Sequence, residues 1–335
     1  MSAKPAMLKA GPVKAKAASG AAPATLARVL VPLDGSLLAD DILGQVRRLL
    51  VRQDAEVRLL RVVSPAMAEG AAFLPNDDAQ AALTHLERHR DRLRAEGASV
   101  DIDVRVGDPA AEILGVAEAW NPSLIAMSTH GRTGPARWLL GSVAERVVRG
   151  ARHPVLLANR HGAGREIPEA RFRRILVPVD GSPESEAALP LALAFGRLYE
   201  AEIVLLHVGP DPAAPMAVPY VVMPPVPSQA ELAAVVEPAR AKVVAAGRPV
   251  QVRTRYAHPA AAILDTITEE ACDLVVMATH GRSGVSRWVF GSVTEKVVRH
   301  ASRPVLVCRA PNAGAEPLEG SGTLSAPSGP GGKGA

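Results

Sequence analysis

The sequence is poor in aromatic residues and cysteine and has no long apolar run, and each shortage excludes a class of protein. Phe, Trp and Tyr make up 3% of the 335 residues, too few for an aromatic platform that stacks bases. Two cysteines, Cys272 and Cys308, cannot form a disulfide framework and suit a reducing compartment. No apolar run approaches the ~20 residues that span a bilayer. We therefore expect a soluble cytoplasmic protein with neither a membrane nor a nucleic-acid partner.

The common catalytic and phosphate-binding motifs are absent as well. Residues 26–310 contain no GxxxxGK[ST] P-loop, no GxGxxG, no GxSxG elbow and no HExxH, and the one GxGxxG match in the sequence, at 329–334, lies in the glycine-rich C-terminal end. Without a P-loop lysine, fast ATP turnover lacks its usual electrostatic support. We expect catalysis to be absent or slow.

The excess of positive charge is confined to one end of the chain. Lys+Arg exceeds Asp+Glu by 38 − 34 = 4, and residues 1–25 supply the whole excess as four lysines. The basic pI of 9.3 therefore does not indicate a basic binding face. Residues 1–25 and 311–335 consist mainly of Ala, Gly, Pro, Ser and Lys, and we expect both ends to be disordered. The role of the lysine-rich end is left open.

The remainder of the chain is an internal duplication. Residues 124–158 align without gaps on 274–308, with 20 of 35 positions identical. RVLVPLDGS at 28–36 matches RILVPVDGS at 174–182. The offset is 146 at the front and 150 at the back, which places a four-residue insertion after the second strand. The predicted division is a domain at 26–158, a linker at 159–171 and a domain at 172–310.

Apolar runs alternate with helical periodicity in each repeat. The continuous apolar segments at 124–127 and 274–277 are typical of strands buried on both faces, hence of a parallel sheet. Ser182 followed by Pro183 predicts a capped helix start. The fold class is therefore α/β, with two tandem doubly wound, Rossmann-like domains. In the first repeat the expected strands are 28–33, 56–62, 100–105, 123–128 and 154–158, the expected helices are 37–52, 79–96, 109–119 and 142–150, and a long loop follows 62.

Two glycine-bearing turns follow the fourth strand of each repeat. The first repeat reads STHGRTGPARWLLGS from Ser128, and the second reads ATHGRSGVSRWVFGS from Ala278. Free backbone amides at a helix start attract phosphate oxygens, and glycine lets an anion approach them closely. The alternative is structural: the glycines fit tight turns, and Ser142 or Ser292 caps the helix. Spacing alone does not choose between the two.

Taken together, these motifs resemble the universal stress protein family in its tandem, two-domain form. The resemblance rests on the AspGlySer after the first strand, the ThrHisGlyArg after the fourth and the GlySerValxGlu that opens the last helix. It implies an adenine nucleotide alpha hydrolase-like fold and divides into members that bind ATP and members that do not. The nucleotide signature is Gly-x2-Gly-x9-Gly-(Ser/Thr). This chain departs at its first position, where Ser128 and Ala278 stand in place of glycine.

The resemblance implies a site residue by residue. Asp34 and Asp180 would face the adenosine, Val62 and Val208 would offer backbone groups to adenine, and Met127 and Met277 would line the base pocket. The nucleotide-binding residues implied for the first repeat are Asp34, Val62, Met127, Ser128, Gly131, Gly141, Ser142 and Val143. Those implied for the second are Asp180, Val208, Met277, Ala278, Gly281, Gly291, Ser292, Val293 and Thr294. The ligand would be ATP, ADP or AMP, with Mg²⁺ held by its phosphates and not by protein side chains.

Two pairs of histidines are expected to be neither catalytic nor metal-binding. His130 and His280, beside the glycines, have no partner base or nucleophile in sequence, so hydrogen bonding within the loop is expected. His85 and His89 lie one helical turn apart, without a third metal ligand, on a face that we expect to be exposed and charged.

The two repeats differ at the turn before the third helix. Gly107 in the first repeat stands where the second has Ala257, so the second would be strained if that turn needs a glycine conformation. The proline-rich loop 209–228 is either a pocket cover, a partner-binding segment or an elongated surface loop.

The predicted function is that of a tandem universal stress protein regulated by an adenine nucleotide, through a change of conformation or assembly. The last strands, at 153–158 and 303–308, are expected to pair edge to edge and make the monomer a pseudo-dimer, with further homodimerisation open. A partner-binding module without nucleotide and a slow ATP hydrolase are the alternatives. The sequence does not identify the stress or the regulatory partner.

Overall fold

The computed structural model describes residues 26–36, 42–51, 54–64, 66–68, 71–73, 76–129, 140–158, 171–211, 226–279 and 291–309. The two ends predicted to be disordered, nearly all of the predicted linker and most of the proline-rich loop lie outside these residues. The predicted domain boundaries stay predictions.

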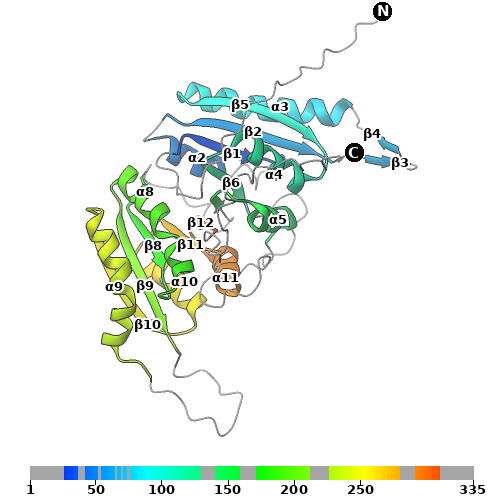
Figure 1. The fold of residues 1–335 in the computed structure, drawn as a ribbon. Helices are drawn as coiled ribbons and strands as arrows, with labels where there is room; N and C mark the ends of the chain where they lie inside the picture. Colours follow the sequence, from blue (N-terminus) through cyan, green and yellow to red (C-terminus); the bar gives the residue numbers. More distant parts are fainter. Residues whose placement is uncertain are drawn as a thin grey trace, which may run out of the picture.

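The first repeat alternates strands and helices as its apolar pattern predicts (Figure 1). Asp108 caps one helix through the amide of Ala111 and is followed by proline at the first helical position. The elements are β1 (Arg28–Pro32), α2 (Ile42–Leu50), β2 (Glu56–Val63), β3 (Ala66–Ala68), β4 (Ala71–Phe73), α3 (Asn76–Ala95), β5 (Ser99–Val106), α4 (Pro109–Trp120), β6 (Leu124–Ser128), α5 (Ser142–Gly150) and β7 (Val155–Ala158).

The second repeat follows the same order. The predicted start at Ser182 is confirmed, since its hydroxyl accepts from the amide of Ser185. The helix it begins is divided, however, because four residues of α7 are followed by a turn before α8. The elements are β8 (Arg174–Pro178), α7 (Pro183–Glu186), α8 (Leu189–Tyr199), β9 (Glu202–Gly209), α9 (Gln229–Ala245), β10 (Val250–Tyr256), α10 (Pro259–Glu269), β11 (Leu274–Ala278), α11 (Ser292–His300) and β12 (Val305–Cys308).

The strands of both repeats form one sheet in the order β10-β9-β8-β11-β12-β7-β6-β1-β2-β5. Pairing is parallel within each repeat and antiparallel between β7 and β12, where Leu156 lies opposite Leu306. In each repeat the strand order reverses beside the first strand, as in a doubly wound fold. The predicted α/β fold class and the edge-to-edge pairing of the last strands are both present.

One prediction was wrong. The stretch after β2 was expected to be a long loop, but β3 and β4 form a two-stranded antiparallel sheet there, with Ala66 opposite Phe73. Each strand has three residues, mostly alanine. Segments this short carry too few alternating positions for a period of two to be recognised.

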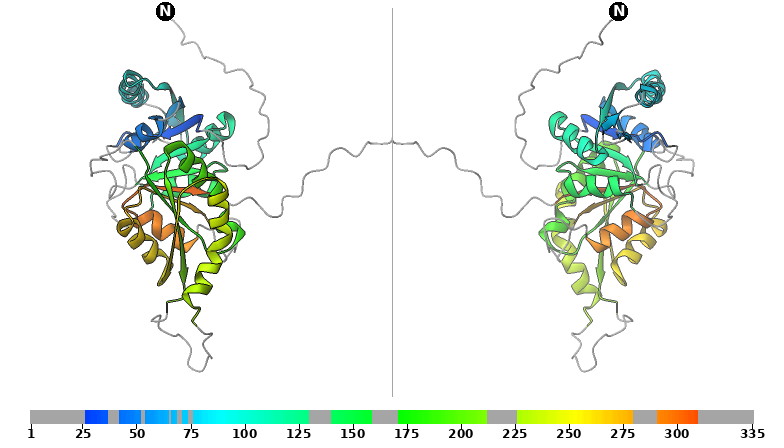
Figure 2. Two further views of the ribbon diagram at one scale, coloured as in Figure 1. Left: turned by 90° about the vertical axis from the view of Figure 1, so that its left-hand side faces the viewer. Right: turned by 90° about the vertical axis from the view of Figure 1, so that its right-hand side faces the viewer.

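Two apolar cores lie on the two faces of the sheet and each is continuous across both repeats. Figure 2 shows helices on both sides of the twisted sheet. One core packs α2, α3, α8 and α9 against the sheet and includes Leu156 and Leu306. The other packs α4, α5, α10 and α11 and includes Leu157 and Val305. The paired strands β7 and β12 contribute to both cores, so the two repeats share one folded interior.

The paired strands β7 and β12 form the seam between the two repeats. Side chains of α2 and α8 also connect the repeats, next to this seam. Arg48 is buried, with 5% of its surface exposed, and its guanidinium lies 4.0 Å from the ring of Phe172. It donates to the carbonyl of Arg171 at 2.8 Å. Tyr199 donates its hydroxyl to the carbonyl of Leu49 at 3.1 Å. A cation on an aromatic face and a buried hydrogen bond thus fix the angle between the halves.

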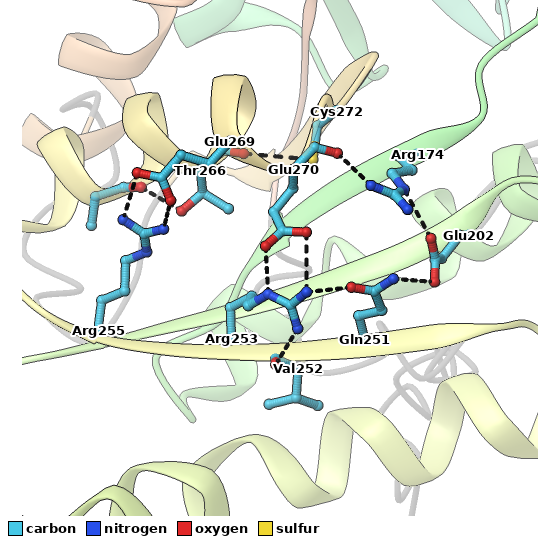
Figure 3. Close-up of polar contacts among 11 residues, drawn as sticks. Arg174, Glu202, Gln251, Val252, Arg253, Arg255, Thr266, Glu269, Glu270 and Cys272 are labelled. Carbon is cyan, nitrogen blue, oxygen red and sulfur yellow. Dashed lines mark hydrogen bonds and ion pairs between the residues drawn. The ribbon is translucent and has the colours of Figure 1, made fainter.

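Polar side chains cover the amino end of the outer strands in the second repeat (Figure 3). Glu202 accepts from Arg174 at 2.9 Å and from Gln251 at 2.7 Å. Arg253 donates to Gln251 at 2.5 Å and to both carboxylate oxygens of Glu270 at 2.5 and 3.1 Å. The chain of contacts ties β8, β9 and β10 to the end of α10.

At the equivalent place, the first repeat has an aromatic ring instead of this network of polar contacts. Trp120 occupies the position of Glu270, and the guanidinium of Arg58 lies 4.3 Å from its ring. Arg28 donates to the Trp120 carbonyl at 2.7 Å. A cation–π contact thus replaces an ion-pair network at an equivalent place.

We predict that the two repeats unfold together because they share both cores. Leu306→Ala removes a fully buried side chain from the β12 face of the seam and should lower the free energy of unfolding by about 2–5 kcal/mol. Urea denaturation followed by circular dichroism and by tryptophan fluorescence should give one coincident transition for the wild type and the variant. Two separated transitions would contradict a shared core.

The Arg253–Glu270 pair predicts a pH-dependent stability. The hydrogen bond from Arg253 lowers the pKa of Glu270 in the folded state, so the pair stabilises above the unfolded pKa of about 4.3 and loses that contribution as pH falls through the lower folded value. Glu270→Gln should cost about 0.5–1 kcal/mol at pH 7, the amount that solvent screening leaves to such a pair, and less near pH 3. Glu118→Gln, at an exposed glutamate of α4, is the control. Equal losses at both pH values would show that the ion pair does not contribute.

Candidate functional site

The candidate site lies where the strand order of the first repeat reverses. Strand β1 lies between β2 and β6, and the carboxyl ends of all three strands open into one cavity of about 600 Å³. The cavity continues to the first turn of α5 and to one side of α3. Its size is in the range of small-molecule sites, and its place is where doubly wound sheets bind ligands.

The residues implied by the family resemblance meet in this cavity. Every one of them that the structure describes in the first repeat lines it: Asp34, Val62, Met127, Ser128, Gly141, Ser142 and Val143. Gly131 and Gly281 lie outside the described residues, as do His130 and His280. The structure therefore brings together one predicted site from three strand ends and a helix start, while its binding role stays a prediction.

The AspGlySer turn fixes the carboxylate of Asp34. Gly35 has a φ of 77°, a conformation that side chains with a Cβ adopt at a cost. This bend lets Oδ1 of Asp34 accept from the amide of Ser36 at 2.9 Å and from its hydroxyl at 2.6 Å. The second repeat repeats the turn at Asp180, with Gly181 at a φ of 81° and distances of 2.9 and 2.5 Å from Ser182. The glycine and the serine hold an acceptor at the end of the first strand.

The backbone of Val62 faces the cavity because β2 is longer than β1. The pairing of β1 ends at Pro32 opposite Leu60, and the carbonyl of Leu60 accepts the last bond, from the amide of Leu33 at 2.8 Å. Successive residues of a parallel strand direct their backbone groups to alternate sides. Two residues past Leu60, Val62 therefore directs its amide and carbonyl toward the open end of β1. The same arrangement holds for Val208, since Leu206 accepts from Val179 at 2.9 Å.

The first turn of α5 presents backbone amides without a side-chain cap. Gly141 is the N-cap residue, with φ −60° and ψ 142°, and no side chain caps the helix. The alternative in which Ser142 caps the helix is therefore wrong, because this serine occupies the first helical position. Gly291 and Ser292 have the same arrangement in α11. The first amides of each helix, with the helix dipole behind them, suit an anion.

The departures at Ser128 and Ala278 do not strain the backbone. These residues are the last of β6 and β11, and neither is among the described residues with positive φ. Thr129, the next residue, accepts from the amide of Gly141 at 2.8 Å and thereby ties the strand end to the helix start. A glycine is not needed at this position for conformational reasons, so a small side chain fits.

The hydroxyl of Thr294 is already engaged. This residue is buried, and its Oγ1 donates to the carbonyl of Ala278 at 3.0 Å. The hydroxyl hydrogen of Thr294, a residue that the resemblance implied for nucleotide binding, is therefore directed to the backbone in this structure. Its backbone amide still lies in the first turn of α11.

The expected strain at Ala257 is also absent. Gly107 has a φ of 154°, whereas Ala257 is not among the described residues with positive φ, so the two turns take different backbone paths. In the first repeat Asp108 caps α4 and pairs with both terminal nitrogens of Arg146 at 2.8 and 2.9 Å. The hydrogen bonds from Arg146 lower the pKa of Asp108. His258 stands at this position in the second repeat and makes no side-chain cap bond.

The sequence analysis did not assign four ionisable residues to the site, although they line the cavity: Arg61, Asp78, His85 and Arg88. His85 was expected on an exposed face, but it is half-buried and lies on the cavity side of α3, with its ring 4.7 Å from that of His89. The signal was present as a spacing of three or four residues along one helix (78, 81, 82, 85 and 88). Only the packing of α3 on β2 shows that this face meets the cavity.

Neither cysteine is placed for chemistry. Cys272 and Cys308 are buried and unpaired with each other, and burial raises the pKa of each thiol to about 12. They are core residues. The described residues also contain no group of three or more His, Cys, Asp or Glu side chains that would hold a metal ion. In the same part of the chain, no helix combines the length and the apolar character that crossing a bilayer requires.

The fold and site define a tandem doubly wound α/β protein with a cavity at the switch point of its first repeat. The universal stress protein family matches residues 25–159 and 171–309, and the chain belongs to this family. The two matches correspond to the two repeats.

Relatives of full tandem length occur in mycobacteria. The chain is 31% identical over 308 residues to the universal stress protein Rv2623 of Mycobacterium tuberculosis, covering 84% of this chain and 96% of that protein. It is 30% identical over 186 residues to the universal stress protein Rv2005c of the same organism, where the match spans 56% of this chain and 61% of the relative. A crystal structure of a universal stress protein from Archaeoglobus fulgidus superposes with a TM-score of 0.64 at 25% identity, covering 86% of this chain and 98% of that one.

The AspGlySer turn generates a test of stability. Gly35→Ala should lower the free energy of unfolding by about 1–2 kcal/mol, because a Cβ is unfavourable at a φ of 77°. Gly44→Ala in α2 is the matched control. It has no atom within 4 Å of the added Cβ and should raise stability by about 0.5–1 kcal/mol. Thermal or urea unfolding measures both, and a neutral Gly35→Ala would show that the bend is not required.

Proposed function

We propose that the chain binds an adenine nucleotide, ATP or its ADP and AMP relatives, at the switch point of each repeat. The observation that carries the proposal is the cavity in which Asp34, the backbone of Val62 and the uncapped first turn of α5 converge. Those residues assigned to a nucleotide by the family resemblance that the structure describes in the first repeat line this one cavity.

Each part of the cavity suits one part of such a ligand. The amides at the start of α5, with the Ser142 hydroxyl beside them, would hold the phosphates. The carboxylate of Asp34, held by Ser36, would accept from the ribose or the base. The amide and carbonyl of Val62 supply one donor and one acceptor for the adenine edge, and Met127 gives it an apolar contact. This donor set fits a nucleotide.

Magnesium would be held through the nucleotide. No described group of three acidic or histidine side chains is available for a dedicated metal site. Mg²⁺ retains several waters and commonly binds substrate phosphates with few protein ligands. We therefore propose that Mg²⁺ accompanies the phosphates and that its binding depends on them.

The action we propose is regulatory: a stress response governed by a nucleotide-dependent change of conformation or assembly, in the cytoplasm. The site is one strand away from the seam between the repeats. Thr129 joins the two, since its amide donates to the carbonyl of Ala158 at the end of β7 and its carbonyl accepts from Gly141 at the start of α5. A ligand at α5 therefore acts on the end of a strand that pairs with β12. Further homodimerisation, if it occurs, would be biased through the same contact.

Nucleotide binding is testable with variants that fill the phosphate end. Gly141→Val together with Gly291→Val places side chains at both helix starts and should weaken Mg-ATP binding at least tenfold in isothermal titration calorimetry. Gly115→Ala, on α4 with open space around the new Cβ, is the control and should bind like the wild type.

Three outcomes separate this proposal from its alternatives. Absence of heat and of competition at millimolar Mg-ATP in the wild type would overturn the proposal and favour a partner-binding module. Binding that survives the double substitution would place the phosphates elsewhere. Phosphate release that disappears in the double variant would identify a slow hydrolase.

The first position of the glycine signature provides a second prediction. Ser128→Gly restores the glycine of the family signature. It should change the affinity for Mg-ATP by less than about threefold, because Ser128 does not have a positive φ. Calorimetry on the single variant measures this. A tenfold gain would show that the serine side chain obstructs the ligand.

A further inference from the structure

The cavity of the first repeat has a second charged end that the nucleotide site does not use. Arg61 on β2 and both His85 and Arg88 on α3 line it together with Asp78. Arg61 is buried, with 7% of its surface exposed, whereas Asp78 and Arg88 are exposed. Besides Asp34 of the nucleotide site, the lining thus contains two arginines, a histidine and one further aspartate. An arginine guanidinium stays charged at any physiological pH and suits phosphate geometry.

The two charged ends lie on opposite sides of β1. The start of α5 follows β6, whereas Arg61 and α3 belong to the β2 side. Strands β6 and β2 flank β1, so these two strands are two inter-strand spacings apart, about 10 Å. The α3 residues also belong to the helical layer opposite to that of α5. A ligand with two separated anionic groups fits two charged ends on opposite sides of β1.

The second repeat lacks this basic end. Its helix α9 aligns with α3 at the offset of 150, since the buried residues Leu86 and Leu93 correspond to Val236 and Val243. At that offset His85 corresponds to Val235 and Arg88 to Pro238.

Arg61, the arginine of β2, is also replaced in the second repeat. At the offset of 146, Arg61 corresponds to His207, which is buried and whose Nδ1 lies 2.9 Å from the carbonyl of Val179. The imidazole ring of His207 is therefore hydrogen-bonded to the residue that follows β8. The basic residues are thus a property of the first repeat and not of the duplicated fold.

We propose that the first repeat selects an adenine nucleotide whose ribose carries a second phosphate, and that the second repeat takes nucleotides without one. The inference rests on the proposed function and adds a ligand class to it. The 5′ phosphates would lie at the start of α5, and the ribose phosphate would pair with Arg61 and Arg88, with His85 as a further donor. Two repeats of one chain then respond to different nucleotides.

The test compares ligands that carry the same number of phosphates in different places. ADP, adenosine 3′,5′-bisphosphate and adenosine 2′,5′-bisphosphate are titrated into the full chain by calorimetry. We expect one of the two bisphosphates to bind the first repeat at least tenfold more tightly than ADP, and to saturate one site per chain at concentrations where the second repeat is empty. The stronger of the two identifies the position of the second phosphate.

Variants assign the effect to residues. Arg61→His introduces the residue of the second repeat, and Arg88→Ala removes the charge at the mouth. Each should weaken the preferred bisphosphate at least tenfold and ADP less than threefold. Arg92→Ala, an exposed arginine on the same helix outside the cavity, should change neither. The thermal transition of each variant without ligand confirms folding, and Arg88→Ala, at an exposed position, keeps the test decisive if Arg61→His is unstable.

The failures of the two proposals are distinguishable. If ADP and Mg-ATP bind but neither bisphosphate is preferred, or if the preference survives both variants, the selective first repeat is overturned and the nucleotide site stands. Equal losses of ADP and bisphosphate in Arg61→His and Arg88→Ala would also overturn it, because the arginines would then serve any nucleotide. If no adenine nucleotide binds, the proposed function itself fails.

Discussion

The antiparallel pairing of β7 with β12 is the interaction on which the rest of the molecule depends. Three residue pairs, centred on Leu156 and Leu306, convert two five-stranded sheets into one sheet of ten strands. Each strand of the pair would otherwise present unpaired backbone groups and an apolar edge to water. Because both strands contribute to both cores, the pairing also merges the apolar interiors of the two repeats. It further brings the two switch points into one rigid frame.

Within this frame the repeats share part of the candidate site and differ in other residues around it. The AspGlySer turn and the uncapped helix start are the same in both halves. The surroundings differ: Arg61 of the cavity wall stands where the other half has His207, and outside the cavity lining the Asp108–Arg146 pair of the first repeat has no counterpart at His258. A duplicated backbone with unequal walls is the arrangement expected if the halves were selected for different ligands.

The sequence was sufficient for the fold because its signals are long and repeated. The apolar runs at 124–127 and 274–277, the Ser182–Pro183 helix start and the duplicated motifs all describe the same alternating order that the structure contains. Local sequence did not predict the short β3–β4 pair, whose three-residue strands carry no readable period. Local sequence also did not predict that the helix after Ser182 is divided into α7 and α8.

Some residues of the candidate site could be predicted from the sequence and others could not. Residues at strand ends and helix starts, such as Asp34 and Gly141, could be placed because the topology of a doubly wound sheet brings those points together. His85 and Arg88 could not, because their place in the cavity depends on the rotation of α3 about its own axis. The engagement of Thr294 with the Ala278 carbonyl was equally inaccessible, since a hydroxyl in the right register does not reveal what it donates to.

The β7–β12 seam also constrains how the protein is made on the ribosome. Strand β7 is complete at Ala158, but the residues that pair with it, 305–307, are added about 150 residues later. At ordinary elongation rates that interval is roughly 8–30 s. Throughout it the nascent first repeat carries an apolar strand with an open edge, the feature that most readily recruits a strand from another chain. Translation in dense polysomes therefore exposes this protein to intermolecular pairing that the finished monomer excludes, and chaperone demand should peak between the synthesis of its two halves.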